Sequence, residues 1–169
     1  MDIDRAHCCC FTGHRPEKLF LPEAELKAML GHQIDAAIAD GYDTFISGMA
    51  RGIDVYAAEE VMARLDRDIK LVCVCPYQDS YMKFGAPWRE RCVAIAAHAA
   101  MQISVCDHYI SSCFSKRNAW MVNNSSRLIA VFDGTRGGTY GTIARAAKCG
   151  LDVRILMLDT RPRATSDTI

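Results

Sequence analysis

Two glycine-rich segments of this 169-residue chain have the composition of anion-binding turns. The first is Ser47-Gly48-Met49-Ala50-Arg51-Gly52-Ile53-Asp54, and the second is Asp133-Gly134-Thr135-Arg136-Gly137-Gly138-Thr139. Glycine has no Cβ to hold a phosphate away from the backbone. A helix that begins at such a turn presents unpaired N–H groups and a partial positive charge. The sequence therefore predicts that both turns bind a phosphate-bearing, nucleotide-like small molecule.

Further polar and aromatic side chains follow other predicted strands. His14 and Arg15 offer donors to an anion, Arg117 opens a predicted helix where it could clamp a phosphate, and Tyr77 could stack on a base. The candidate ligand-binding residues are Thr12, Gly13, His14, Arg15, Ser47, Gly48, Met49, Ala50, Arg51, Gly52, Asp54, Pro76, Tyr77, Arg117, Asn118, Asp133, Gly134, Gly137, Gly138 and Thr139.

Asp54 argues against a phosphate at the first turn, because its negatively charged carboxylate would repel a phosphate bound there. Two interpretations stay open. Asp54 either caps the helix that follows the turn or accepts a hydrogen bond from a ribose hydroxyl.

Strand-like and helix-like segments alternate along the whole chain. Continuous apolar strands between amphipathic helices predict an α/β fold, with a Rossmann-like, doubly wound, mostly parallel sheet flanked by helices. We expect residues 1–159 to form one domain and residues 160–169 to form a disordered polar tail. The predicted strands are 7–11, 44–47, 70–75, 101–106, 128–132 and 153–158, and the predicted helices are 23–40, 54–65, 88–98, 115–125 and 139–149.

Charge and hydropathy exclude several classes of protein. The 20 basic and 20 acidic side chains cancel, so the chain lacks the basic excess typical of sequence-independent nucleic-acid binding. Its longest apolar stretches, such as 71–75 and 128–132, are far shorter than the ~20 residues that span a bilayer. The first residues contain no basic region that leads into an apolar one. We expect a cytoplasmic protein with no membrane partner.

Nine cysteines are many for a chain of this length. None forms a paired C-x-x-C unit, and the odd count argues against a disulfide framework. Buried cysteine behaves as a small hydrophobic residue, which is the favoured interpretation for most of them. The alternative is a redox or metal site built from Cys8, Cys9 and Cys10. We expect no metal centre and no certain cofactor.

Several ordered motifs together resemble the SLOG superfamily, which unites DprA/Smf and LOG proteins, and most closely its YpsA-like branch. The motifs are the first glycine-rich turn, Thr12-Gly13-His14-Arg15-Pro16, Arg117-Asn118 followed by Met121-Val122, and Asp133-Gly134 followed by Gly137-Gly138-Thr139. The resemblance covers Cys8 to about Leu158. It implies a Rossmannoid fold, a pocket for a nucleotide-like ligand and, often, a homodimer.

The chain departs from the LOG pattern at one position that matters for chemistry. LOG enzymes, which this chain resembles, cleave the N-glycosidic bond of nucleoside monophosphates with an arginine and a glutamate. Arg117 matches the arginine, whereas Thr142 or Arg145 stands where the glutamate would fall, and the proline of the turn is missing. Such cleavage needs a carboxylate to stabilise the developing positive charge or activate water. The nearby substitutes are Asp54 and Asp133, so Arg117 and Asp133 are the candidate catalytic pair.

The favoured hypothesis is a protein that binds a nucleotide or nucleotide derivative and acts as a sensor or regulator. An unidentified partner protein would fit that role. The alternative is an enzyme, a LOG-like nucleotide N-glycosidase. The third and least favoured hypothesis is a DprA-like module for single-stranded DNA.

Overall fold

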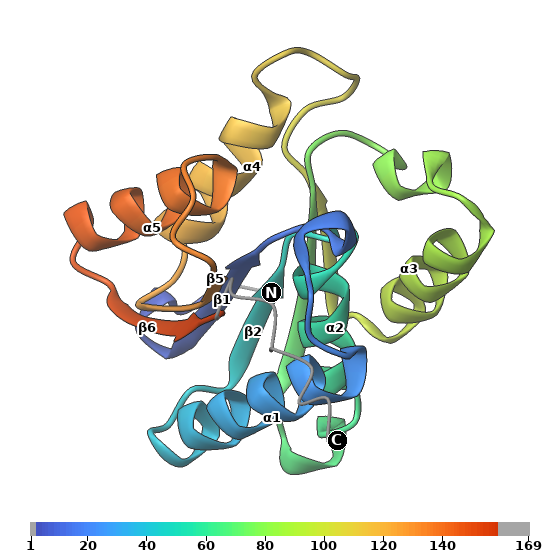
Figure 1. Cartoon of the computed structure of the whole chain (residues 1–169). Helices are drawn as coiled ribbons and strands as arrows, with labels where there is room; N and C mark the ends of the chain where they lie inside the picture. Colours follow the sequence, from blue (N-terminus) through green and yellow to red (C-terminus); the bar gives the residue numbers. More distant parts are fainter. Residues whose placement is uncertain (1–2, 159–169) are drawn as a thin grey trace, which may run out of the picture.

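The protein is built on one six-stranded parallel sheet, described over residues 3–158 of the computed structural model (Figure 1). The strand order is β4-β3-β2-β1-β5-β6. Every neighbouring pair is parallel, which confirms the predicted Rossmann-like α/β fold and makes the sheet parallel throughout. The strands are β1 (Cys8–Gly13), β2 (Thr44–Ser47), β3 (Lys70–Cys75), β4 (Met101–Ser104), β5 (Arg127–Phe132) and β6 (Asp152–Met157).

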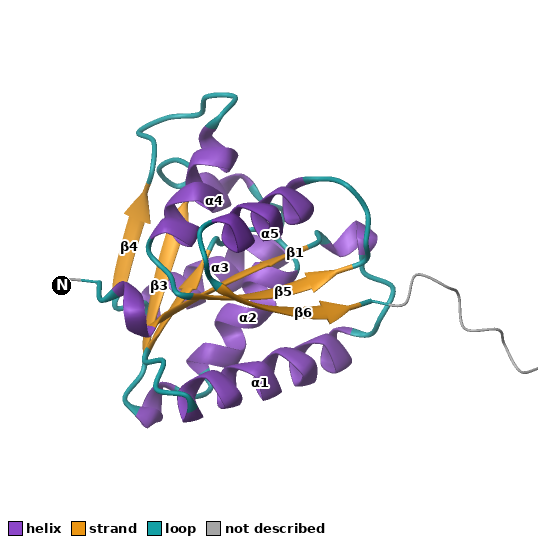
Figure 2. Ribbon diagram, turned by 90° about the vertical axis from the view of Figure 1, so that its left-hand side faces the viewer, coloured by secondary structure: helices purple, strands orange, loops and turns teal. Residues whose placement is uncertain are grey.

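Five helices cover the two faces of the sheet, with α1, α2 and α3 on one face and α4 and α5 on the other (Figure 2). They are α1 (Glu23–Ala39), α2 (Ile53–Met62), α3 (Ala86–His98), α4 (Cys113–Asn123) and α5 (Gly138–Lys148). Short 3-10 turns lie at Arg5–His7, Pro16–Lys18, Leu65–Arg67 and Ser80–Lys83.

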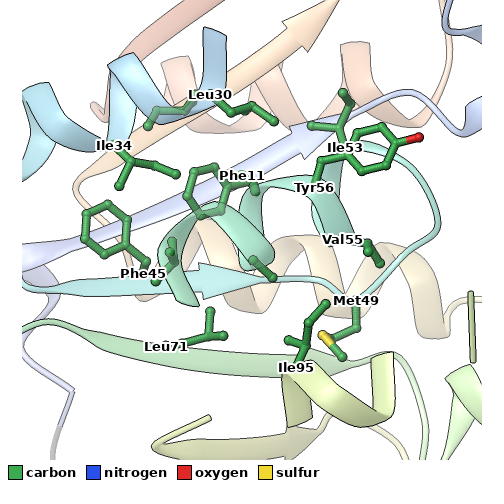
Figure 3. Close-up of a cluster of buried hydrophobic side chains, with 14 of the residues drawn as sticks. Phe11, Leu30, Ile34, Phe45, Met49, Ile53, Val55, Tyr56, Leu71 and Ile95 are labelled. Carbon is green, nitrogen blue, oxygen red and sulfur yellow. The ribbon is translucent and has the colours of Figure 1, made fainter. Parts of the chain in front are cut away.

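Alternation along β1 explains why the sheet is buried on both faces. Cys9 and Phe11 pack into the larger core beneath α1, α2 and α3, where Figure 3 shows Phe11 beside Phe45 and Ile34. Cys8 and Cys10 point the other way, into the core beneath α4 and α5. Because successive strand side chains point to opposite faces, a run of small and apolar residues can fill both cores.

Several predicted boundaries were wrong by a few residues. The first strand continues to Gly13, because Thr12 and Gly13 pair with Ala130 and Val131 of β5. The second helix ends at Met62, and its predicted last turn is a separate 3-10 segment. The fourth helix begins two residues early, at Cys113, and ends at Asn123. The tail predicted for residues 160–169 lies outside the described residues.

The chain crosses from β4, at one edge of the sheet, to β5, which pairs with β1 near the middle. This is the point where strand order reverses, and the carboxyl ends of β1 and β5 lie side by side there. Ligands of doubly wound sheets bind at this crevice. Within residues 3–158, no helix is long and apolar enough to cross a membrane.

The cysteines are almost all packing residues, as the sequence indicates. All nine thiols are free, seven are buried, Cys106 is half-buried and Cys149 is exposed. Burial raises the pKa of Cys8 to about 11 and that of Cys10 to about 12. Within the described residues, no group of three or more His, Cys, Asp or Glu side chains is placed to hold a metal ion. The structure therefore supports packing at Cys8, Cys9 and Cys10.

Thiol accessibility tests this assignment. We expect iodoacetamide at pH 8 to alkylate Cys149 first and Cys106 more slowly, and to reach the other seven thiols only in denaturant. Burial keeps the reagent from all seven thiols, and burial also raises the pKa of Cys8, Cys9, Cys10, Cys73, Cys75 and Cys92. Peptide mass spectrometry of the native and unfolded protein measures the order. Rapid modification of Cys8, Cys9 or Cys10 in the native protein would contradict the packing assignment.

Gly13 is required by packing between β1 and α2. A Cβ on Gly13 would lie 2.5 Å from the Cβ of Ile53, the first residue of α2. The next contact is similar: a Cβ on Gly52 would lie 2.6 Å from the carbonyl oxygen of His14, and Gly52 has φ +90°. The two glycines thus let the start of α2 lie directly against the end of β1.

Replacing Gly13 with alanine tests this close contact. We expect Gly13→Ala to lower the free energy of unfolding by about 1–3 kcal/mol, because overpacking forces backbone or side-chain shifts. Gly141→Ala is the matched control, since a Cβ there meets nothing within 4 Å. Urea unfolding measures both. If Gly13→Ala is as stable as the parent protein, the backbone relaxes around the added methyl group and the contact does not require glycine.

Candidate functional site

Three adjoining hollows lie where the carboxyl ends of the strands meet. Hollow A, of about 320 Å³, lies between the first glycine-rich turn and the segment from Pro76 to Gly85. Hollow B, of about 340 Å³, lies between the end of β1 and the start of α5. Hollow C, of about 280 Å³, lies between α4 and α5. Arg15, Ala50, Phe114 and Arg117 line both A and B, which makes one continuous cleft.

Arg117 of α4 is the central side chain of this cleft. It is only 6% exposed, its Nη1 donates to the Gly48 carbonyl, and the same nitrogen lies 3.4 Å from Oδ2 of Asp54. Its buried Nε has no hydrogen-bond partner in the described structure. A guanidinium carries five donors, so this one retains capacity for an anion in the cleft.

Gly48 is a glycine because Arg117 and Asp54 occupy the space beside it. A Cβ there would lie 2.6 Å from Oδ2 of Asp54 and closer still to Arg117. Burial lowers the pKa of Arg117 and raises the pKa of Asp54, while the charge of each partner opposes the shift of the other. The ion pair is what allows two charges to lie this deep in the protein.

The structure decides against the helix-cap interpretation of Asp54. Gly52 is the N-cap of α2, and Asp54 lies inside the first turn. Its carboxylate accepts from the Ala50 N–H at 3.4 Å. Ser47 accepts from the Met49 N–H at 3.2 Å and donates to the Asp54 carbonyl at 2.9 Å. These two N–H groups of the predicted phosphate turn are therefore engaged by the protein itself.

His14 and Asp133 face each other across the point where strand order reverses. Nε2 of His14 lies 2.7 Å from Oδ1 of Asp133, and both side chains are more than nine-tenths buried. Asp133 also accepts from the N–H and the hydroxyl of Thr135. Although burial opposes it, these hydrogen bonds and the nearby His14 hold the pKa of Asp133 below its ordinary value. Asp133 lines none of the three hollows, whereas His14 lines hollow B.

The start of α5 is open to an anion. Its N-cap, Gly137, supplies no side chain to the first N–H groups, and a Cβ on Gly138 would meet nothing within 4 Å. Asn118 of α4 donates to Thr142 at 3.0 Å, which fixes α4 against this end of α5. Thr139 is buried and lines hollow B beside Gly138. The uncapped helix start thus faces the cleft.

Hollow A is cationic and partly aromatic. Among the described residues that line it, Arg15, Arg51, Lys83 and Arg117 are basic and none is acidic. Lys83 lies 4.9 Å from the centre of the Tyr77 ring, and Arg51 pairs with Glu17 at 2.9 Å. Such a wall favours an anionic ligand that carries a flat ring.

The cleft gathers most of the residues that the sequence singled out. Five of the predicted set line none of the three hollows: Ser47, Gly52, Asp133, Gly134 and Gly137. Sequence reasoning missed the following lining residues of hollows A and B: Phe11, Glu17, Lys18, Ser80, Lys83, Phe84, Gly85 and Phe114. For Ser80, Lys83, Phe84 and Gly85, the one sequence signal was their position after β3, because that segment begins at the same edge of the sheet as the two turns.

Two solved structures share the fold at low sequence identity. DNA processing protein A from Helicobacter pylori, whose structure is titled for its single-stranded DNA binding mode, aligns with a TM-score of 0.66 and 16% identity over 91% of this chain and 66% of that one. DNA processing protein A from Streptococcus pneumoniae aligns with a TM-score of 0.57 and 18% identity over 87% of this chain and 49% of that one. The chain thus spans about two thirds and half of these neighbours.

Comparison with curated proteins gave no match. A family model for YpsA, described as the YspA SLOG family, matches residues 9–154. That span begins inside β1 and ends inside β6, so it includes every element that lines the cleft. The resemblance found in the glycine-rich turns is thereby confirmed, and the chain belongs to the YpsA family of SLOG proteins.

Proposed function

We propose that the protein binds a nucleotide or nucleotide derivative in the cleft formed by hollows A and B, and that it acts as a ligand sensor or regulatory protein. The observation that carries this proposal is Arg117, a buried guanidinium that lines both hollows. A guanidinium at that position can donate charge-assisted hydrogen bonds to a phosphate in the cleft, and these are stronger than hydrogen bonds between neutral groups.

Two further features support a nucleotide over a simple anion. Gly138 and Thr139 place the uncapped start of α5 in hollow B, where its N–H groups can donate to an anionic or polar part of the ligand. Tyr77, Phe84 and Phe114 place aromatic rings around hollow A, which suits a base. One ligand that combines a phosphate with a flat ring would use both walls.

The contacts of the two aspartates support binding over cleavage of a glycosidic bond. Asp133 is engaged by His14 and Thr135 and lines no hollow, whereas Asp54 lines hollow B but is paired with Arg117. A carboxylate that must stabilise an oxocarbenium ion or activate water has to reach the sugar. The alternative, a nucleotide N-glycosidase, would need one of these carboxylates to leave its partner.

We also propose a homodimer. Within residues 3–158, the edge strand β6 pairs only with β5 and exposes Ile155 and Met157, which are 43% and 60% accessible. An edge strand with exposed apolar side chains favours association with a second copy. Light scattering coupled to size-exclusion chromatography gives the molar mass that decides between one chain and two.

Ligand binding is tested by thermal stability. We expect at least one nucleoside mono- or diphosphate to raise the melting temperature, since a ligand at 100 times its Kd stabilises the folded state by about 2.7 kcal/mol. The matching nucleosides and inorganic phosphate are the controls, because they test the nucleoside part and the phosphate part of the ligand separately. If no nucleotide of the four common bases shifts the melting temperature, the proposed function is wrong.

The role of Arg117 is tested with its charge partner removed at the same time. Arg117→Gln combined with Asp54→Asn leaves no unpaired buried charge, so we expect a folded protein. We expect its nucleotide affinity to fall by about 10- to 100-fold, the loss of a charge-assisted hydrogen bond. Arg154→Gln, an exposed side chain on β6 outside the cleft, is the matched control. Undiminished affinity in the double variant would remove Arg117 from the site.

Cleavage is tested directly by incubating the protein with nucleoside monophosphates and separating the products by chromatography. We expect the nucleotide to stay intact, because both aspartates near the cleft are held by other groups. Release of free base that disappears in Asp54→Asn or in Asp133→Asn would establish the enzyme instead of the sensor.

A further inference from the structure

The two hollows of the cleft suggest a ligand with two halves. We propose that the natural ligand contains two nucleoside units joined through a phosphate bridge, with one unit in hollow A, the other in hollow B, and the bridge over Arg15 and Arg117. This inference rests on the proposed function and narrows the ligand to the class of dinucleotides.

The sizes of the hollows match this arrangement. Hollow A has about 320 Å³ and hollow B about 340 Å³, so neither is a minor extension of the other. Each lies at the lower end of the range for small-molecule sites, about 300–1,000 Å³. A mononucleotide in one hollow would leave the other, of equal size, unfilled.

An anionic bridge fits best at the boundary that the two hollows share. Arg15 and Arg117 line both hollows, and so do Ala50 and Phe114. Within residues 3–158, Arg15 makes no ion pair, and the guanidinium of Arg117 is paired with Asp54 through Nη1. Two guanidinium groups that border both hollows offer donors to two phosphate groups.

The chemistry of the two hollows differs, as expected for two halves of one ligand. Hollow A offers the rings of Tyr77, Phe84 and Phe114 to stack on a base. Hollow B shares Phe114 and adds hydrogen-bonding groups that hollow A does not have, among them Thr12, Asn118 and Glu17. A nucleoside in hollow A would therefore be held mainly by stacking, and one in hollow B mainly by hydrogen bonds to its sugar and base.

Titration calorimetry with matched ligands tests the inference. We expect diadenosine diphosphate to bind at least about tenfold more tightly than ADP, or diguanosine diphosphate more tightly than GDP by the same factor, equivalent to about 1.4 kcal/mol. Each pair shares its two phosphates and differs by one nucleoside. If a mononucleotide binds and neither dinucleoside diphosphate binds more tightly, the inference is wrong and the proposed function stands. If no nucleotide of either kind binds, both are wrong.

Valine substitutions at two glycines test where the two nucleoside units bind, and a third substitution is the control. A Cβ at Gly85, in hollow A, or at Gly138, in hollow B, meets nothing within 4 Å, so we expect valine at either position to leave the protein folded and to narrow one hollow. We expect Gly85→Val and Gly138→Val each to reduce the affinity for the dinucleoside diphosphate to about that of ADP, and only one of them to weaken ADP itself.

Gly141→Val is the matched control, because Gly141 is equally open, lies on α5 and lines hollow C but neither A nor B. We expect it to leave both affinities within about twofold of the parent value. If either Gly85→Val or Gly138→Val leaves the dinucleoside diphosphate affinity unchanged, the ligand occupies one hollow only and the inference fails. Melting temperatures of the three variants without ligand confirm that each is folded.

Discussion

The buried ion pair of Arg117 with Asp54 is the interaction on which the cleft depends. Arg117 comes from α4 on one face of the sheet, and Asp54 from α2 on the other, so the pair joins the two helical layers at the carboxyl edge. Both charges are more than nine-tenths buried. Because Gly48 leaves room for them, the turn after β2 can close over the guanidinium and accept its hydrogen bond. Without that space, hollows A and B would not share a common wall.

The topology of the sheet explains why residues from distant parts of the chain meet here. The crossover from β4 to β5 places the ends of β1 and β5 side by side, and His14 and Asp133 follow those ends directly. Their contact takes Asp133 away from the cleft and leaves His14 on its wall. In an enzyme that cleaved nucleotides, we would expect the carboxylate to face the ligand. Asp133 instead contacts His14, which lines hollow B.

Low identity to the DNA processing proteins limits what the shared fold implies. At 16% and 18% identity the alignment supports the fold alone, and the chain has equal numbers of acidic and basic residues. The positive charge is local, gathered in hollow A by Arg15, Arg51, Lys83 and Arg117. A local cationic cleft with an aromatic wall favours a small anionic ligand, whereas a long nucleic acid requires an extended basic surface.

The sequence by itself determined the class of fold, because hydrophobic periodicity and the glycine–helix junctions are local properties of the chain. It also determined the edge of the sheet where the site lies, since parallel strands all end on one side. Only the tertiary structure decided which turn residues face inward. Gly13 makes room for Ile53, and Gly48 makes room for Arg117. Asp133 contacts His14. The physical reason is that such contacts join residues far apart in the chain, and no spacing along the sequence records their distance in space.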